Sequence, residues 1–299
     1  MKIQHSYRSR EEGVLYLVPT PIGNLGDLTY RAVDILQSAD LLLVEDSRQT
    51  GKLRAHFGIE TPMLSYQEHK HEERLPEILQ RLEAGETLAQ LSDAGMPSIS
   101  DPGQGLVAAC LAAGFPVLPL PGASAGITAL VASGLASQPF TFIGFLPKKK
   151  KAQAEALRPY ASRPETLIFY ESPYRLAKTL ENLVGVFGGE RPAVVARELT
   201  KKFETFYRGQ LGELAAYFAK ENTKGEICLL IAGQKNAQGQ DEDDFWERHK
   251  ALPLKDLVPL VAEAKGYRTN DAIKYVAKRL NVKKQYVYQT YHDPKKGGV

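Results

Sequence analysis

Short apolar runs alternate with helical patterns from Val14 to Gly233, and the apolar runs end in polar or glycine-rich residues. Continuous apolar runs of this length indicate buried strands, whereas apolar residues spaced three and four apart indicate helices. Strands that alternate with helices favour a parallel sheet. In the first half of the chain the pattern predicts strands over 14–18, 41–44, 87–91 and 116–120, with helices over 27–37, 73–84 and 103–113.

The second half of the chain follows the same order of apolar runs and polar strand ends. We therefore expect a second α/β layer of the same kind. No sequence repeat of fixed period is present. The runs that predict its strands are FTFIGFLP (140–147), TLIFYESP (166–173), AVVARELTKKFE (193–204) and EICLLIAG (226–233).

A third segment is short and helical. After Gly233 the stretch QKNAQGQDEDD has no periodicity, so we predict a linker over 234–250. Beyond it, helices are predicted over 254–264, 269–280 and 283–291, with a break at Gly266 and a cap at Thr269 or Asn270. Such a unit resembles a helix-turn-helix, which contacts nucleic acid, although trihelical units also bind proteins.

The charge is unevenly distributed. The chain carries a net charge of +3, but residues 251–299 hold ten Lys or Arg against four Asp or Glu, a balance of +6, which leaves −3 for the preceding residues. A basic terminal segment on a slightly acidic body suggests a polyanionic partner. Solvated surface charge is the alternative.

Composition excludes several classes of protein. Apolar residues make up 43% and charged residues 24% of the chain, as in soluble globular proteins, and no apolar run is long enough to span a bilayer. The polar start reads as a flexible basic arm over 1–12 and not as a secretory signal. Two cysteines, Cys110 and Cys228, fit a reduced, cytoplasmic compartment. No Cys or His pair has metal-ligand spacing, so no metal site is expected.

The most informative segment is LSDAGMPSISDPG, residues 91–103. Ligands of open α/β sheets bind beyond the carboxyl ends of the strands, where this segment begins. Gly95 and Gly103 permit positive φ and close approach of backbone to a ligand, and the two prolines stiffen the loop. We interpret it as a binding loop that carries Asp93 and Asp101.

Other strand ends are less specific. Glu45, Asp46 and Arg48 follow the second strand together. No GxxxxGK[ST] phosphate loop is present, and PTPIGNLGDL is not GxGxxG. A Ser-His-Asp hydrolase needs a histidine near a strand end, which none of the six provides. No acid–base pair can be assigned from spacing alone, because each carboxylate could be a structural cap.

Eight motifs in order carry a resemblance to a known family: PTPIGNLGDLTYRA, VEDSRQT, SDAGMPSISDPG, PGASAGITAL, FIGFLP, FYESPYR, ARELTKKFE and KGEICLLIAG. Residues 13–233 resemble the ribosomal RNA small-subunit methyltransferase I family, within the tetrapyrrole methylase superfamily. The terminal helical unit resembles the one that this family carries.

The resemblance implies an α/β fold of two αβα domains of the tetrapyrrole methylase type, over 13–121 and 122–233, with a helical C-terminal module over 251–299. It implies S-adenosylmethionine in the cleft between the domains, usually in a homodimer. It further implies 2′-O-methylation of a cytidine ribose in the decoding region of small-subunit rRNA. Free rRNA and the assembled small ribosomal subunit both stay open as the substrate.

The resemblance also implies cofactor-binding residues. Ser92-Asp93-Ala94 stands where porphyrin-type members have Gly-Asp-Pro, which argues against a tetrapyrrole substrate. Carried over by motif, the cofactor pocket comprises Pro21, Asp93, Ala94, Gly95, Met96, Ser98, Ser124, Ala125, Tyr170, Glu171, Leu199 and Gly225.

Methyl transfer to a ribose needs alignment and a base that accepts the proton of the 2′-hydroxyl. Glu45, Asp46, Asp101 and Lys202 are the candidate bases, and Arg48 could hold a phosphate. Residues 148–151, four successive lysines, suit RNA backbone or a solvated loop equally well. Two alternatives remain. A tetrapyrrole methylase would have no use for the basic tail, and a non-enzymatic ligand-sensing regulator would bind a short DNA duplex without methyl transfer.

Overall fold

The computed structural model describes residues 3–6, 13–67, 70–234 and 245–292. The chain forms two compact units, residues 1–234 and 235–299, which are taken separately below. Most of the predicted arm (residues 7–12) and most of the predicted linker (residues 235–244) lie outside the described residues. No helix in the described ranges has the length and apolar character needed to cross a membrane.

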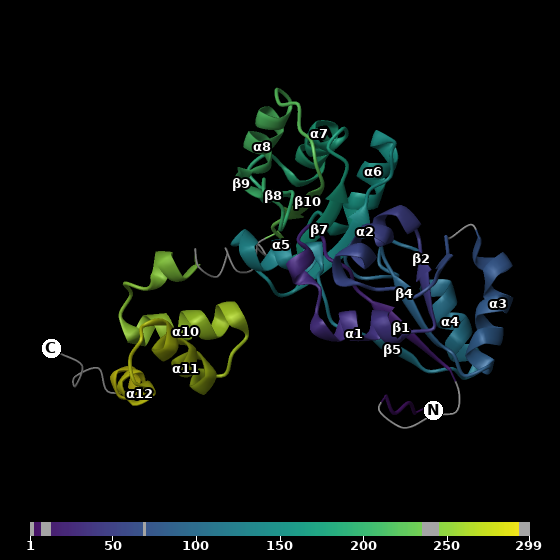
Figure 1. Ribbon diagram of the computed structural model, residues 1–299. Helices are drawn as coiled ribbons and strands as arrows, with labels where there is room; N and C mark the ends of the chain where they lie inside the picture. Colours follow the sequence, from purple (N-terminus) through teal and green to yellow (C-terminus); the bar gives the residue numbers. More distant parts are fainter. Residues whose placement is uncertain (1–2, 7–12, 68–69, 235–244, 293–299) are drawn as a thin grey trace. The chain divides into compact units, whose positions relative to one another are not determined.

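The first sheet of the larger unit is entirely parallel, as the sequence predicts. Its strand order is β3-β2-β4-β1-β5 (Figure 1). The predicted strands are confirmed, and only the short edge strand β3 was not expected. The strands are β1 (Val14–Val18), β2 (Leu41–Val44), β3 (Met63–Ser65), β4 (Thr87–Leu91) and β5 (Val117–Pro119).

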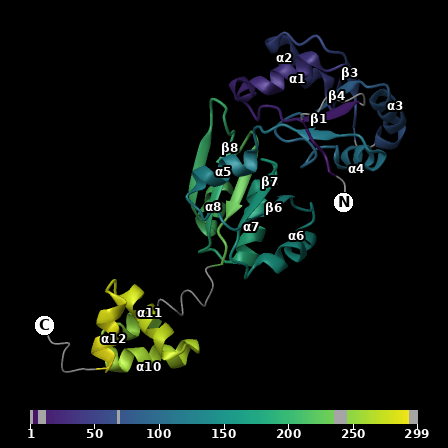
Figure 2. The ribbon, with the colours of Figure 1, turned by 90° about the horizontal axis from the view of Figure 1, so that it is seen from below.

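Helices cover both faces of this sheet because successive strand residues point to opposite sides. Leu41 and Leu43 pack with helices α3 (His71–Glu83) and α4 (Gln104–Ala113). Leu42 and Val44 pack with helices α1 (Tyr30–Ser38) and α2 (Ser47–Phe57) on the other face (Figure 2). All four residues of β2 are therefore buried, which explains its uninterrupted apolar sequence.

The second half also forms an α/β layer, as expected, but its sheet is mixed rather than parallel. Its strand order is β6-β7-β10-β8-β9; β6 and β7 are parallel, and the other neighbours are antiparallel. The short connection between β8 and β9 cannot make a parallel crossover. Strand β9 has no apolar run and was not predicted. The strands are β6 (Phe140–Phe145), β7 (Thr166–Glu171), β8 (Pro192–Arg197), β9 (Thr205–Gln210) and β10 (Ile227–Ile231).

Helices also cover both faces of the second sheet. Helix α5 (Ala125–Ser133) packs on one face, against Ile168, Val194 and Leu230. The opposite face, which includes Phe169, packs with the remaining helices of this half (Figure 1). These helices are α6 (Lys150–Leu157), α7 (Leu176–Phe187) and α8 (Leu211–Phe218).

Two helix starts in the first half differ from prediction. Helix α1 begins after Thr29, whose hydroxyl accepts a hydrogen bond from the Ala32 N–H at 3.1 Å, while the predicted cap Asp27 lies in a preceding 3-10 turn, Leu25–Asp27. Helix α2 was missed, although Asp46 caps it: the Asp46 carboxylate accepts from the Arg48 N–H at 2.8 Å. Its exposed face is polar, so its apolar periodicity is weak.

The smaller unit contains the three predicted helices, α10 (Leu254–Lys265), α11 (Thr269–Arg279) and α12 (Lys284–His292). Gly266 ends α10 with φ +64°, as predicted, but the N-cap of α11 is Arg268 rather than Thr269 or Asn270. The linker does not extend to residue 250. Residues 245–249 form a short helix, and Trp246 is buried in the core of this unit because its large apolar ring packs with Leu257 and Val276.

Candidate active site

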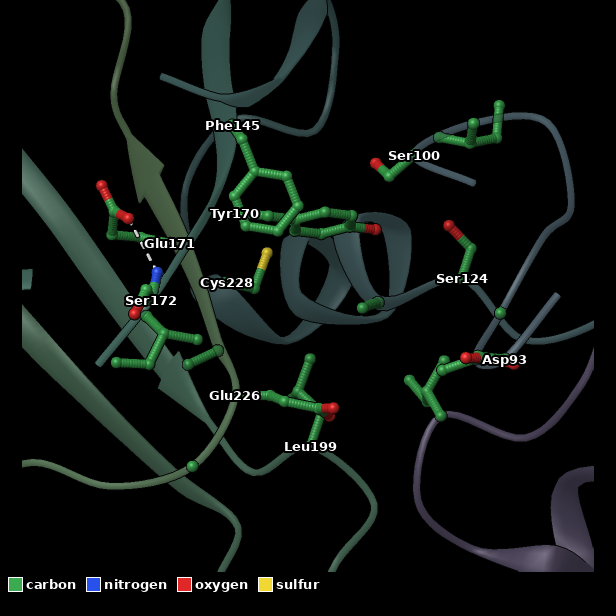
Figure 3. Close-up of a pocket in the computed structure, with 18 of the residues that line it drawn as sticks. Asp93, Ser100, Ser124, Phe145, Tyr170, Glu171, Ser172, Leu199, Glu226 and Cys228 are labelled. Carbon is green, nitrogen blue, oxygen red and sulfur yellow. Dashed lines mark hydrogen bonds between the residues drawn. The ribbon is translucent and has the colours of Figure 1, made fainter. Parts of the chain in front are cut away.

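A cavity of about 450 Å³ lies where the strand ends of the first sheet meet β7, β10 and α5 (Figure 3). One wall is the loop after β4, residues 93–101. The other wall is formed by the second half of the larger unit and includes Phe145, Tyr170 and Cys228. This position agrees with the expectation that ligands bind beyond the carboxyl ends of parallel strands.

Backbone hydrogen bonds fix the first wall. Thr20 and Gly95 exchange two N–H···O bonds of 3.0 Å, and the Ser92 hydroxyl donates to the Gly95 carbonyl oxygen. Gly95 has φ +81°, which is favourable only for glycine. The loop is thereby tied to the segment after β1, and residues 93–96 are directed along the cavity.

Close packing explains why the second glycine of this loop, Gly103, has no side chain. Gly103 precedes α4 at φ +144°, and an added Cβ would overlap the Ser98 hydroxyl and the Gln90 amide. The Gln90 amide donates to the Pro102 carbonyl at 2.6 Å, which holds the end of the loop under the sheet. Ser98 itself faces this packing and does not line the cavity, contrary to the pocket that the resemblance implies.

Carboxylates on the first wall carry little compensating positive charge. Burial, and then the neighbouring Asp93, raises the pKa of Asp101 above its usual range. Burial also raises the pKa of Asp93, and Asp46 adds to that shift, although the Asp46 N–H donates to Asp93 Oδ1 at 3.2 Å. The pKa of Glu45, which does not line the cavity itself, is raised by burial and by the charges of Asp101, Asp93 and Asp46. These shifts favour the protonated forms, so this wall is suited to bind a cation or accept a proton.

The second wall is apolar with a few fixed polar groups. The Tyr170 hydroxyl accepts a hydrogen bond from the Gly126 N–H at 3.2 Å, and the Phe145 ring packs against the Tyr170 ring with centroids 5.8 Å apart. Burial raises the pKa of the Cys228 thiol to about 12, so the thiol is neutral and unreactive. Cys110 and Cys228 are both free and buried.

Glu171 touches the cavity but is held by the protein. Its two oxygens accept hydrogen bonds from the Thr179 hydroxyl at 2.6 Å and the Ser172 N–H at 2.7 Å. Arg175 adds an ion pair at 3.5 Å, and the Glu171 side chain is 1% exposed. Glu171 therefore shapes the wall (Figure 3).

A glycine is required at position 225 for a steric reason, as at position 103. It lies at φ +96°, and an added Cβ would overlap the Glu198 side chain. That carboxylate accepts from Lys201 at 3.0 Å and from the Glu226 N–H at 2.9 Å. Hydrogen bonds to Glu226 and Lys201 lower the pKa of Glu198 despite its partial burial.

Ten of the twelve cofactor residues that the resemblance implies line this cavity. Pro21 lines a second, adjoining cavity, and Ser98 lines neither. Among the catalytic candidates, Asp101 lines the first cavity, whereas Glu45, Asp46, Arg48 and Lys202 line neither. Lining residues that sequence reasoning missed are Ile22, Ile99, Ser100, Phe145, Ser172, Pro173, Ala196, Glu226, Ile227 and Cys228.

Phe145 is the last residue of β6 and Ser172 directly follows β7, and both strands are predicted from the sequence, so the strand-end rule could have found these two residues. Ile99 and Ser100 belong to the segment 91–103 that the sequence analysis interprets as a binding loop, whereas the placement of residues such as Ala196 and Cys228 depends on how the two halves fold together. Within the described ranges, no three His, Cys, Asp or Glu side chains are grouped to hold a metal ion.

The cavity fits a molecule that is partly apolar and partly charged. Its volume is within the range of small-molecule sites, and its lining combines apolar side chains with a few polar groups. Asp93 offers a carboxylate and Ser124 a hydroxyl, while Leu199, Ile227 and Met96 offer apolar contact. This donor set suits an adenosyl group joined to a charged sulfonium.

The fold and site define a class, and comparison with known proteins agrees with it. Residues 14–215 match the family model of Tetrapyrrole (Corrin/Porphyrin) Methylases. The crystal structure of uroporphyrin-III C-methyl transferase from Thermus thermophilus complexed with S-adenyl homocysteine superimposes with a TM-score of 0.51. It is 23% identical in sequence and covers 73% of this chain and 97% of that chain, which shows the shared fold.

Closer relatives define the family. The chain is 46% identical over 294 residues to the ribosomal RNA small subunit methyltransferase I of Streptococcus pyogenes serotype M3, covering 98% of this chain and 100% of the relative. It is 44% identical over 293 residues to the protein of the same name from Bacillus subtilis, covering 98% and 99%. The chain belongs to the ribosomal RNA small subunit methyltransferase I family.

Proposed function

We propose that this protein transfers a methyl group from S-adenosylmethionine to the 2′-oxygen of a cytidine ribose in the decoding region of small-subunit rRNA. The observation that carries the proposal is the cavity between the acidic loop after β4 and the apolar second wall. Full-length relatives named as small-subunit rRNA methyltransferases support the substrate class.

S-adenosylmethionine, when bound, supplies an activated methyl group. The chain's own residues supply binding and alignment. Asp93 would meet the positive or hydroxyl-bearing part of the cofactor, and Leu199 and Ile227, which also line the cavity, would provide apolar contact. Glu171 keeps the β7 end in place through its bonds to Thr179 and Ser172.

Asp101 is the preferred base, because of the four candidate bases it is the one that lines the cavity. A carboxyl whose pKa is raised by burial is a better proton acceptor than one fully solvated. Glu45, Asp46, Arg48 and Lys202 act from beside the cavity, where they bias charge or contact RNA. Asp101→Asn is expected to lower kcat by at least tenfold with the affinity for S-adenosylmethionine changed less than twofold.

The decisive experiment is methyl transfer to small ribosomal subunits from a strain that lacks the gene. Incubation with labelled S-adenosylmethionine should label one rRNA cytidine, and mapping should find the methyl on the 2′-oxygen. Parallel reactions with free rRNA and with assembled subunits identify the natural substrate. Label in a porphyrin or corrin precursor instead would support the tetrapyrrole alternative. Tight binding to duplex DNA without transfer would support the regulator.

The helical unit is proposed to contact RNA. It has its own core, and Tyr286, Tyr288 and the basic residues Lys283 and Lys284 lie on or next to the exposed side of α12. Ending the chain after Gln234 should preserve S-adenosylmethionine affinity and reduce methylation of subunits sharply. The salt dependence of RNA binding should become shallower as phosphate contacts are lost. A truncated protein as active as the full chain would exclude this role.

Two further proposals follow from the family resemblance. The protein acts as a homodimer, which sedimentation equilibrium at micromolar concentration tests. It acts in the cytoplasm, where small ribosomal subunits are its partners, and cell fractionation with ribosome sedimentation tests that location. A strictly monomeric active protein would refute the first proposal.

A further inference from the structure

A second cavity, of about 380 Å³, adjoins the first. Of the twelve cofactor residues that the resemblance implies, it is lined by Pro21, Asp93 and Ala94. It is bounded by the segment after β1, the first turns of α2 and the end of β4. Its lining includes Leu25, Gln49, Lys52 and Lys201. These elements bring together three motifs that sequence analysis singled out separately.

The two cavities share a wall. Ile22, Asp93, Ala94 and Glu226 line both of them. A molecule in the second cavity therefore lies directly beside one in the first, with the Asp93 carboxylate at the boundary. This is the arrangement that transfer of a group between two bound molecules requires.

The chemistry of the second cavity differs from that of the first. It offers an ammonium group, an amide and the exposed apolar side chain of Leu25, which is 38% exposed. Lys201 is already neutralised by Glu198 and Glu226, at 3.0 and 2.9 Å. Among the ion pairs of the described residues none involves Lys52, whose amine donates to Gln49 Oε1 at 3.2 Å. The charge of Lys52 is thus available to an anion.

We propose that the second cavity binds the acceptor nucleotide, with Lys52 on a phosphate, Gln49 on a polar edge of the nucleotide and Leu25 against the base. The ligand class is a single ribonucleotide unit of an RNA strand. An ammonium, an amide and an apolar surface match its three parts, phosphate, polar edge and flat base. This inference rests on the proposed function and assigns its acceptor site.

Two substitutions test the site in the full-length protein. Lys52→Gln removes the charge and should raise KM for small ribosomal subunits about fivefold to tenfold and reduce the salt slope by about one. Leu25→Trp narrows the cavity from an exposed position and should raise KM at least tenfold. Calorimetric affinity for S-adenosylmethionine should change less than twofold in both variants. Lys220→Gln, an exposed lysine that lines neither cavity, is the matched control and should leave KM unchanged.

The outcomes separate the two proposals. If the parent protein methylates subunits and both variants keep its KM and salt slope, the acceptor-site inference is wrong and the function stands. If the variants lose cofactor affinity in parallel with activity, the second cavity belongs to the cofactor site and the inference is overturned. If the parent protein transfers no methyl group to rRNA, the proposed function fails, and the acceptor assignment fails with it.

Discussion

The two walls of the first cavity hold their carboxylates in opposite ways. On the first wall, Asp93 and Asp101 are partly buried with raised pKa values and no ion pair among the described residues. On the second wall, Glu171 is saturated by Thr179, Ser172 and Arg175. An unpaired carboxylate can respond to a ligand, whereas a saturated one maintains shape. The contrast indicates that the chemistry belongs to the first wall and the rigidity to the second.

Sheet topology explains the contrast. Parallel strands deliver their carboxyl ends to one edge, so Glu45, Asp46 and Asp93 converge there and repel one another. Arg48 offsets the charge of Asp46, with which it pairs at 3.4 Å, but its side chain is 90% exposed, and no ion pair of the described residues joins it to Glu45 or Asp93. In the second half, helix α7 begins close behind β7 and supplies Arg175 and Thr179 to Glu171.

The largest expected effect is a loss of folding stability when the hydrogen bonds of Glu171 in the second wall are removed. Glu171→Ala leaves the Thr179 hydroxyl and the Ser172 N–H without their acceptor and removes the ion pair with Arg175, so the free energy of unfolding should fall by roughly 2–4 kcal/mol. Urea denaturation measures this change. Glu181→Ala, which removes an exposed pair with Lys150, is the control and should change stability by less than about 0.5 kcal/mol. Equal effects of the two substitutions would remove the distinction between the walls.

The next effect should appear in ligand binding at the first wall. Asp93→Ala removes the carboxylate shared by both cavities and should weaken S-adenosylmethionine binding roughly tenfold to a hundredfold, the range for a hydrogen bond to a charged group. Calorimetry gives the affinity, and the melting temperature should stay near that of the parent protein. Asp34→Ala, an exposed position on α1, is the control. Unchanged affinity in Asp93→Ala would show that this wall does not bind the cofactor.

The parts of this site that depend on neighbouring residues can be predicted from the sequence, and the parts that depend on residues far apart in the chain cannot. The loop after β4 was predicted because its strand, prolines and glycines are local signals, and Asp93 and Asp101 do border the cavity. Ser98 lines neither cavity, because its side chain lies against Gly103 at a φ of +66°, which no motif reveals. The antiparallel pairing of β10 with β7 and β8 joins distant segments, so apolar runs predict these strands without their direction.

A substitution that introduces backbone strain tests whether packing at Gly103 holds the loop of the first wall. Gly103→Ala forces a Cβ into the Ser98 hydroxyl and the Gln90 amide at positive φ, and should lower the free energy of unfolding by about 1–2 kcal/mol. The same loop carries Asp93, so cofactor affinity should fall as well. Gly51→Ala is the matched control, since its Cβ meets nothing within 4 Å in helix α2 and should stabilise slightly. A tolerated Gly103→Ala would mean that the loop is not held by this packing.

The smallest expected effect is a gain in folding stability when the Asp101 carboxylate is removed. The pKa of Asp101 is raised from 3.8 by burial and by Asp93, so between 3.8 and its value in the folded protein the native state retains a proton that the unfolded chain has lost. Stability therefore falls as pH rises through this window, and at neutral pH the ionised side chain is a net cost. Asp101→Asn removes that cost and should raise the melting temperature at pH 7 by roughly 1–3 °C. The difference should shrink toward pH 3.5, where the parent carboxyl is protonated, and kcat should fall if this group accepts the proton. A melting temperature that is unchanged at pH 7, or a difference that does not vary with pH, would show that Asp101 is as well compensated as Glu171.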